Sequence, residues 1–278
     1  MSVPSGADVS KGYFPGLSAV VRTSATQLVR PPSQARRTEA ARRLMRNGIL
    51  VGALAGILIA TLMIWFDARE IALMPPRNAA GLWPARFLTD FGKDTYVLLL
   101  LAIVLLGVML AIPAMHEAAR ARLLGISLRL QFVLLAVSVP LVVGEPLKWI
   151  VGRGRPFVGG EANPFNFVHF AGMEAYFSFP SAHSITAFAL AFAVAAAWPR
   201  LRGVMIAYAL VIAFTRLVLL AHHPSDVVAG AAIGIIGAMC VRYWFAVRGL
   251  GFAVDPDGAI SPLPQDGLKG VAGEAQAP

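Results

Sequence analysis

The sequence predicts an all-α membrane protein, a bundle of six transmembrane helices. Its 278 residues are 57% hydrophobic and only 14% charged. The apolar residues gather in runs close to the ~20 residues that a helix needs to cross the hydrocarbon of a bilayer. Ionisable side chains cluster beside the ends of several runs, where such groups are costly and usually functional. Together these observations favour a polytopic membrane protein over a soluble domain.

Six runs have the length expected of spans, and they follow one another without an internal repeat. The runs are residues 49–66, 96–115, 130–147, 181–198, 204–220 and 227–247. A polar, arginine-bearing segment comes before them, and a segment rich in Gly, Pro and Asp comes after them, both typical of disorder. We therefore expect a largely disordered basic tail at 1–47, a membrane domain at 48–248 and a second disordered tail at 249–278.

The formal charge of +9 is placed as membrane topology requires. With the N-terminus in the cytoplasm, sixteen of the 24 lysines and arginines fall on the cytoplasmic side of six spans, as the positive-inside rule demands. This predicts both termini in the cytoplasm. A basic stretch without a recognition motif does not indicate nucleic-acid binding. Cys240 is the single cysteine, so no disulfide within the chain is possible.

Three clusters of polar residues lie at the ends of spans, all on the predicted outer face. They occupy residues 148–156, 180–183 and 216–226. The loop 149–180 beside them is rich in aromatic residues. Those residues fit an aromatic belt at the membrane interface, or a hydrophobic entrance that admits a lipid from the outer leaflet.

The first cluster brings two cations together. Lys148 ends the third span, and Arg155 follows seven residues later, directly before Pro156. An ammonium and a guanidinium can share one phosphoryl group, the guanidinium through a bidentate fork. We expect Pro156 to stop the helix and to direct Arg155. Taken alone, these cations, with Arg153 between them, also fit ordinary interfacial anchors.

The second cluster opens the fourth span. Pro180 suits a first helical turn, whose free amides bind anions with help from the helix dipole. Ser181 adds a hydroxyl donor, and His183 lies beside whatever those amides hold. A solitary histidine at a helix start is more often a cap, so the interpretation depends on a second histidine.

That second histidine lies in the third cluster. Arg216 closes the fifth span, His222 follows, and Asp226 falls in the first turn of a helix opened by Pro224. A carboxylate bonded to one imidazole nitrogen makes the other nitrogen a better nucleophile. Metal binding by His222, His223, Asp226 and His183 is the alternative, but three nearby cations would repel a metal ion and favour an oxyanion.

These residues resemble the type 2 phosphatidate phosphatase superfamily, in its membrane-bound bacterial branch. Its signature has three parts: Lys-x6-Arg-Pro, Pro-Ser-Gly-His and Ser-Arg-x5-His-x3-Asp. Every position is matched except two, where Ala182 replaces glycine and Thr215 replaces serine. The resemblance covers roughly residues 60–247.

The resemblance implies a metal-independent lipid phosphatase without a cofactor. His222 is then the nucleophile that forms a phosphohistidine, Asp226 orients it, and His183 protonates the leaving oxygen and later activates water. The phosphoryl oxygens bind to four further residues, which are Lys148, Arg155, Ser181 and Arg216.

The expected partner is a phosphorylated lipid in the outer leaflet of a bacterial inner membrane. The candidates are undecaprenyl diphosphate, phosphatidate or phosphatidylglycerophosphate, and a phosphate of lipid A. The alternative is a non-catalytic polytopic carrier or binder of anionic lipids. A peroxidase-like oxidation fits the aromatic membrane setting less well. The sequence does not specify the oligomeric state.

Overall fold

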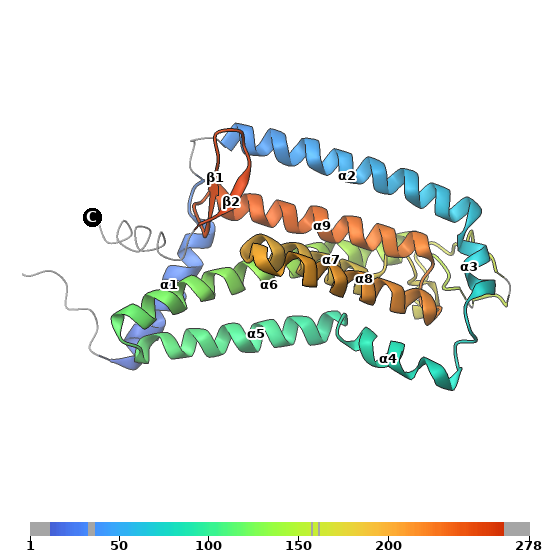
Figure 1. Cartoon of the computed structure of the whole chain (residues 1–278), viewed down its shortest axis with the longest axis horizontal. Coiled ribbons are helices and arrows are strands. Elements are labelled where there is room, and N and C mark those ends of the chain that lie inside the picture. Colours follow the sequence, from blue (N-terminus) through green and yellow to red (C-terminus); the bar gives the residue numbers. More distant parts are fainter. Residues whose placement is uncertain (1–11, 33–36, 157, 161, 264–278) are drawn as a thin grey trace, which may run out of the picture.

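A computed structural model of the chain describes residues 12–32, 37–156, 158–160 and 162–263. Long helices run side by side along the longest axis (Figure 1). The α-helices are α1 Tyr13–Val29, α2 Arg37–Trp65, α3 Asp67–Leu73, α4 Trp83–Asp90, α5 Asp94–Ala111, α6 Glu117–Val151, α7 Ala182–Ala197, α8 Arg202–Val218 and α9 Pro224–Ala246. Short 3-10 turns lie at Ala80–Leu82, Ile112–Ala114, Glu174–Tyr176 and Pro199–Leu201. The strands are β1 Phe252–Val254 and β2 Ile260–Pro262.

Five helices are long and apolar enough to cross a membrane. They are Arg37–Trp65, Ala80–Ala114 (which contains α4 and α5), Glu117–Val151, Pro199–Val218 and Pro224–Ala246. The apolar window of α2 has none of its residues buried, as expected for a helix whose side chains face lipid. The protein therefore crosses the bilayer several times. The fourth predicted span coincides with α7, a shorter apolar helix of 16 residues.

The helix α9 lies at the centre of the bundle and contacts α2, α6 and α7. Phe132 of α6 and Phe245 of α9 meet edge to face at 5.4 Å in the main hydrophobic core. Towards the other end of α9, Gly230 lets α7 come close, because a Cβ atom there would lie 2.4 Å from the carbonyl oxygen of Ser181. Small residues permit such close helix packing in membranes. The first turns of α7 and α9 are thereby held together.

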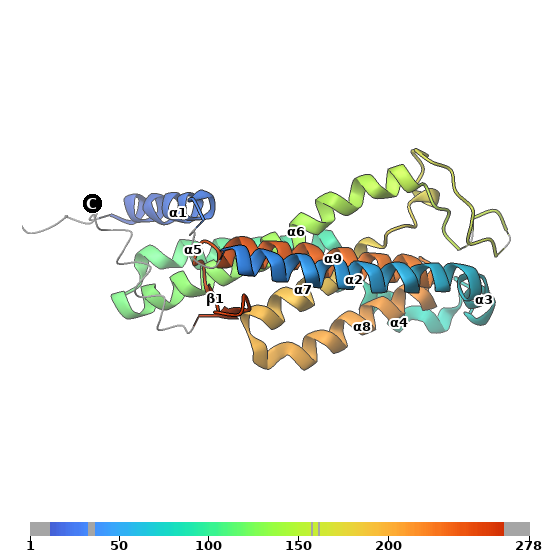
Figure 2. The ribbon, with the colours of Figure 1, turned by 90° about the horizontal axis from the view of Figure 1, so that it is seen from above.

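Both terminal segments contain more regular structure than the sequence suggested. Within the segment 1–47, α1 covers Tyr13–Val29 and α2 begins at Arg37. Beyond residue 249, β1 and β2 form an antiparallel hairpin. The Phe132 ring packs against Phe252 at 4.8 Å, so the hairpin gains order by covering the end of the core. Figure 2 shows α1 and this hairpin at the end of the bundle opposite α3.

Candidate active site

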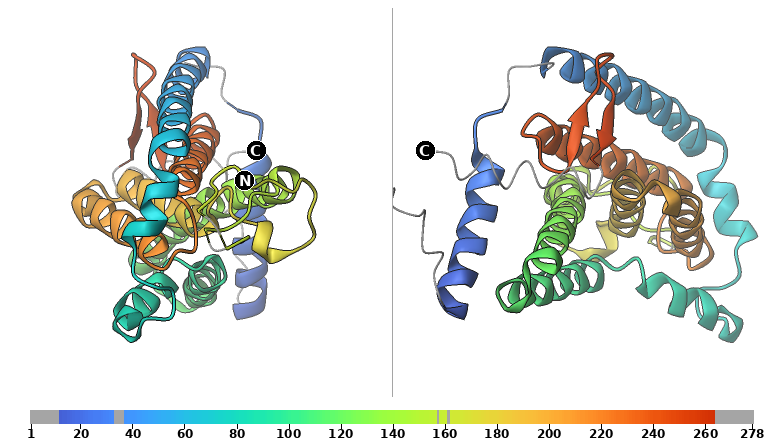
Figure 3. Two further views of the ribbon diagram at one scale, coloured as in Figure 1. Left: turned by 90° about the vertical axis from the view of Figure 1, so that its right-hand side faces the viewer. Right: turned by 60° about the vertical axis from the view of Figure 1, so that its left-hand side comes forward.

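The three predicted clusters meet at one end of the bundle, beside α3. The backbone amide of Ser181 donates to the carbonyl oxygen of Asp226 at 3.1 Å, which joins the second cluster to the third. The amide of Ser178 donates to the carbonyl oxygen of Arg153 at 3.0 Å, which joins the first cluster to the segment before α7. Figure 3 shows this end of the molecule towards the viewer in its left panel. Segments distant in sequence therefore form one site.

The helix α6 ends at Val151 and is capped by Gly152, so it stops before Pro156 and the expectation that Pro156 stops this helix is wrong. Gly152 adopts a left-handed conformation with φ of 58°, the usual way to end a helix. A Cβ atom at Gly152 would lie 1.8 Å from the carbonyl oxygen of Val168, so a glycine is required. Lys148 thus lies in the last turn of α6, whereas Arg155 lies in the loop.

His222 presents one imidazole nitrogen to the site and uses the other to hold its position. Its Nδ1 atom lies 2.7 Å from the carbonyl oxygen of Ser178. A carbonyl can only accept, so Nδ1 carries the proton and Nε2 keeps its lone pair. The side chain is only 3% exposed. Burial lowers the pKa of His222 well below its usual value, with further contributions from Arg216 and Arg155, so the imidazole is neutral.

Asp226 supports His222 less directly than the sequence suggested. Its Oδ2 atom is 4.0 Å from the Nδ1 atom of His222, beyond hydrogen-bond distance. Oδ2 instead accepts from the hydroxyl of Ser178 at 2.6 Å and from the backbone amide of His223 at 2.8 Å. The hydrogen bond from the His223 amide caps α9, because His223 precedes this helix and Asp226 lies in its first turn. Ser178 thus bridges Asp226 and His222.

A buried ion cluster lies behind Asp226, and sequence reasoning did not include it in the site. Arg153 is 0% exposed and donates from Nη1 to Oδ1 of Asp226 at 2.5 Å and from Nη2 to Oδ2 of Asp67 at 2.8 Å. The carboxylate of Asp67 also accepts from the Ser225 hydroxyl at 2.5 Å. The available signal was a charged residue directly after the first apolar run, a costly position beside hydrocarbon.

The four predicted phosphate-binding residues come from different elements around His222 and His183. Lys148 pairs with Glu145 at 2.5 Å, and Arg155 pairs with the exposed Glu174 at 3.3 Å. The Nη1 atom of Arg216 donates to the hydroxyl of Thr89 at 2.7 Å, so α4 holds the Arg216 side chain. Burial lowers the pKa of the Arg155 guanidinium below its usual value.

Ser181 and His183 lie at the start of α7, as predicted. Ser181 is its N-cap and accepts from the amide of Ser184 through its hydroxyl at 3.5 Å. His183 is the second residue of the helix and lies within the electrostatic reach of Arg216, Lys148 and Arg155. The site thus combines two histidines, three cations and the first turn of a helix, an arrangement suited to holding an oxyanion.

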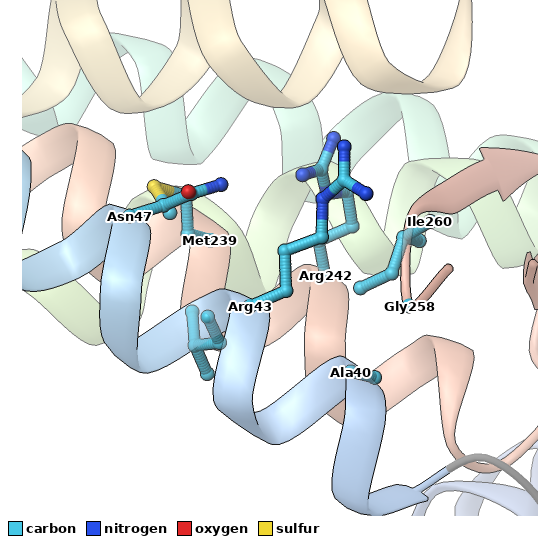
Figure 4. A pocket seen from close by; sticks show the side chains of 8 residues that line it. Ala40, Arg43, Asn47, Met239, Arg242, Gly258 and Ile260 are labelled. Atoms are coloured by element: carbon cyan, nitrogen blue, oxygen red, sulfur yellow. The ribbon is translucent and has the colours of Figure 1, made fainter.

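A second polar feature lies at the opposite end of α9, about 24 Å along the helix from Asp226 at 1.5 Å per residue. There Arg43 of α2 and Arg242 of α9 line a small pocket under the β-hairpin (Figure 4). Arg43 pairs with Asp257 at 2.7 Å, and Arg242 stacks on Phe192 at 4.9 Å. The ion pair satisfies the Arg43 guanidinium locally, whereas the Nε atom of Arg242 is buried without a hydrogen-bond partner among the described residues. Across the described ranges, no three His, Cys, Asp or Glu side chains form a group that could hold a metal ion.

Comparison with known proteins agrees with this geometry. The PAP2 superfamily pattern matches residues 129–250. The chain is 32% identical to the lipid A 1-phosphatase of Rhizobium johnstonii over 197 residues, which are 70% of this chain and 80% of that protein. It is 31% identical to the lipid A 1-phosphatase of Rhizobium etli over 201 residues, which are 72% of this chain and 86% of that protein. No solved structure matched the chain.

A third relative, YbjG of Escherichia coli K12, carries a provisional undecaprenyl-diphosphatase name and is 33% identical over 133 residues, 45% of this chain and 63% of that protein. The fold defines a multi-pass membrane protein, in which two histidines and three cations gather at one end of the bundle. The chain belongs to the PAP2 superfamily and is a phosphatase. The resemblance noted from the three sequence clusters is therefore confirmed.

Proposed function

We propose that the protein is a lipid phosphatase that cleaves a phosphate from a membrane lipid through a phosphohistidine intermediate. One observation carries the mechanism, the hydrogen bond from Nδ1 of His222 to the carbonyl oxygen of Ser178. This bond leaves the Nε2 lone pair free to attack phosphorus in line. A buried, neutral imidazole oriented in this way is an activated nucleophile.

The remaining site residues have separate roles in that reaction. Lys148, Arg155, Arg216 and Ser181 bind the phosphoryl oxygens and stabilise their charge in the transition state, as positioned cations do in phosphoryl transfer. On binding, the phosphoryl group replaces Glu145 and Glu174 as the partners of Lys148 and Arg155. His183 donates a proton to the leaving oxygen and then takes one from the water that cleaves the phosphohistidine.

The first substrate candidate is lipid A phosphorylated at its 1-position. The two lipid A 1-phosphatases match 70% and 72% of this chain, whereas YbjG matches 45%. Undecaprenyl diphosphate is the second candidate, and phosphatidate or phosphatidylglycerophosphate is the third. The end of α6 has an exposed aromatic side chain at Trp149, and the loop beside the site has two more at Phe165 and Phe170, which suit contact with lipid tails and headgroups.

The proposed location is a bacterial inner membrane. If α7 serves as a sixth span, both termini lie in the cytoplasm and the site lies at the periplasmic face, next to the outer leaflet. The membrane domain of residues 48–248 then contains the whole site. A non-catalytic binder of anionic lipids is the rival proposal, and it differs in one outcome: it binds the lipid but releases no phosphate.

Phosphate release from a panel of lipids tests the proposal. Purified protein in detergent micelles is incubated with lipid A 1-phosphate, undecaprenyl diphosphate, phosphatidylglycerophosphate and phosphatidate, with the His222→Ala variant as control. We expect release from lipid A 1-phosphate to be fastest, to persist in EDTA and to be inhibited by vanadate, a phosphate mimic. Binding without release by the wild type would favour the rival, and activity abolished by EDTA would restore the metal alternative.

A further inference from the structure

Asp67 reaches the site from a helix that precedes the matched part of the chain. It is the first residue of α3, whereas the PAP2 pattern begins at residue 129. Its carboxylate is 0% exposed and accepts from Nη2 of Arg153 at 2.8 Å. It also accepts from the hydroxyl of Ser225 at 2.5 Å and from the amide of Ser225 at 3.2 Å. A carboxylate buried this completely is held only where partners satisfy it.

Arg153 is the link between Asp67 and the site. Its Nε and Nη2 atoms donate to the carbonyl oxygen of Pro164 at 3.0 and 2.8 Å. Its Nη1 atom donates to the Ser225 hydroxyl at 2.6 Å and to Asp226 at 2.5 Å. The planar guanidinium therefore has one orientation that satisfies all these acceptors, and rotating it would break several bonds at once.

The charges of this cluster explain why a second carboxylate is needed. With Asp226 alone, the Arg153 guanidinium would neutralise the only carboxylate beside the nucleophile. Asp67 compensates Arg153, so Asp226 keeps its negative charge while its position remains locked. That charge lies 4.0 Å from Nδ1 of His222, and it favours the positive charge that the imidazole gains when Nε2 bonds to phosphorus.

We propose that Asp67 is a positioning residue for phosphoryl transfer, which holds Arg153 so that Arg153 fixes Asp226 and, through Ser178, the nucleophile His222. This inference rests on the proposed phosphatase function. The order of contacts is continuous: Asp67 to Arg153, Arg153 to Asp226, Asp226 to the Ser178 hydroxyl, and the Ser178 carbonyl to His222. Asp67 bonds to Arg153 and Ser225, and neither belongs to the proposed phosphate-binding residues.

The Asp67→Asn variant tests this role through separate measurements of kcat and KM. The phosphate-binding cations are untouched, so KM and the inhibition constant of inorganic phosphate should stay within about threefold. We expect kcat, calculated per enzyme molecule able to bind phosphate, to fall roughly tenfold to a hundredfold, as when the outer partners that orient metal ligands are lost. A wild-type kcat would overturn the proposal, as would a loss confined to KM.

Glu70 supplies a matched control. It lies one turn after Asp67 on the same face of α3, is also 0% exposed and has no hydrogen-bond partner for its carboxyl group among the described residues. Glu70→Gln therefore changes a buried acid to an amide in the same helix without touching Arg153. We expect its kcat at pH 7 to stay within about twofold of the wild type. An equal fall in both variants would show that α3 matters only for folding.

A double-mutant cycle with Arg153→Gln shows whether Asp67 acts through Arg153. If it does, Asp67→Asn should lower kcat no further once Arg153 is gone, because coupled residues are not additive. The double variant removes both charges of the Asp67–Arg153 pair, and Asp226 keeps the Ser178 hydroxyl and the His223 amide as donors, so it should fold even where a single variant does not. Fully additive effects, or a double variant with wild-type kcat, would contradict the proposal.

Failure of this inference is distinguishable from failure of the proposed function. If the wild type releases no phosphate from any lipid in the panel, the function itself is wrong. If the wild type is active and Asp67→Asn matches it, only the role of Asp67 is wrong.

Discussion

The Nδ1 atom of His222 lies 2.7 Å from the carbonyl oxygen of Ser178, although 44 residues separate the two in sequence. The hydroxyl of the same serine donates to Asp226 at 2.6 Å. Ser178 thus sets the imidazole tautomer with its backbone and holds the carboxylate with its side chain. Asp226 is linked to His222 through this serine rather than by a direct hydrogen bond.

Ser178→Ala should reduce activity and stability together. The carbonyl remains and His222 keeps its tautomer, but Asp226 loses one of its donors. Hydrogen bonds to charged groups contribute about 1.5–3 kcal/mol, so we expect a loss of about that size in the free energy of unfolding and a several-fold lower kcat. Ser184→Ala is the control, since the Ser184 hydroxyl is buried without a partner among the described residues. Equal losses in both variants would contradict the bridging role.

His222→Ala should abolish the covalent intermediate. Rapid acid-free quenching of wild-type enzyme with radiolabelled substrate is expected to leave label on the protein, in the acid-labile and base-stable form typical of a phosphoramidate. The variant should carry no label and should show less than about a thousandth of the wild-type kcat, because removal of a nucleophile costs at least this factor. Label retained by the variant would place the nucleophile elsewhere.

His183→Ala should slow turnover by about 10²–10⁴, the usual contribution of general acid–base catalysis. The loss should be smaller for a substrate with a good leaving group, such as p-nitrophenyl phosphate, which needs no proton in the first step. Comparing kcat for that ester and for a lipid phosphate measures this difference. Equal losses for both substrates would argue against a role in protonating the leaving group.

Glu70 should make stability depend on pH. Burial, followed by the nearby charges of Asp67 and Asp226, raises the pKa of Glu70 from 4.5 to about 8. Between these values the folded protein keeps a proton that the unfolded chain has lost, so stability falls as pH rises through this window. The thermal midpoint should therefore drop more from pH 5.5 to pH 8.5 in the wild type than in Glu70→Gln. Parallel pH profiles would show that Glu70 is ionised when folded.

Gly230→Ala should separate α7 from α9. The added Cβ atom would lie 2.4 Å from the carbonyl oxygen of Ser181 and 2.9 Å from Cβ of Ser184. Overpacking of this kind usually destabilises by about 1–3 kcal/mol, and it should lower kcat because the two helices carry His183 and Asp226. Gly203→Ala in α8 is the control, with no atom within 4 Å of its new Cβ. Wild-type stability in Gly230→Ala would show that the helices adjust freely.

The sequence alone predicted the long apolar helices and proposed which residues bind a phosphoryl group. Apolar runs of spanning length can be recognised from the sequence alone, because each helix satisfies its own backbone hydrogen bonds. Helix starts near Pro180 and at Pro224 are equally local, since a proline or a capping residue acts within one turn. Spacing along the chain was therefore enough to nominate Lys148, Arg155, His183 and His222 as candidate site residues, and their roles stay a prediction.

Only the tertiary structure decided what holds those residues in position. Arg153 and Asp67 are 86 residues apart, and nothing in either local pattern indicates the other. The support given to His222 by a backbone carbonyl leaves no trace in residue type, because every residue carries one. The hairpin after residue 249 likewise becomes ordered through its contact with the core. A local sequence pattern indicates which helix or loop carries a side chain, whereas the partners of that side chain depend on how the helices pack.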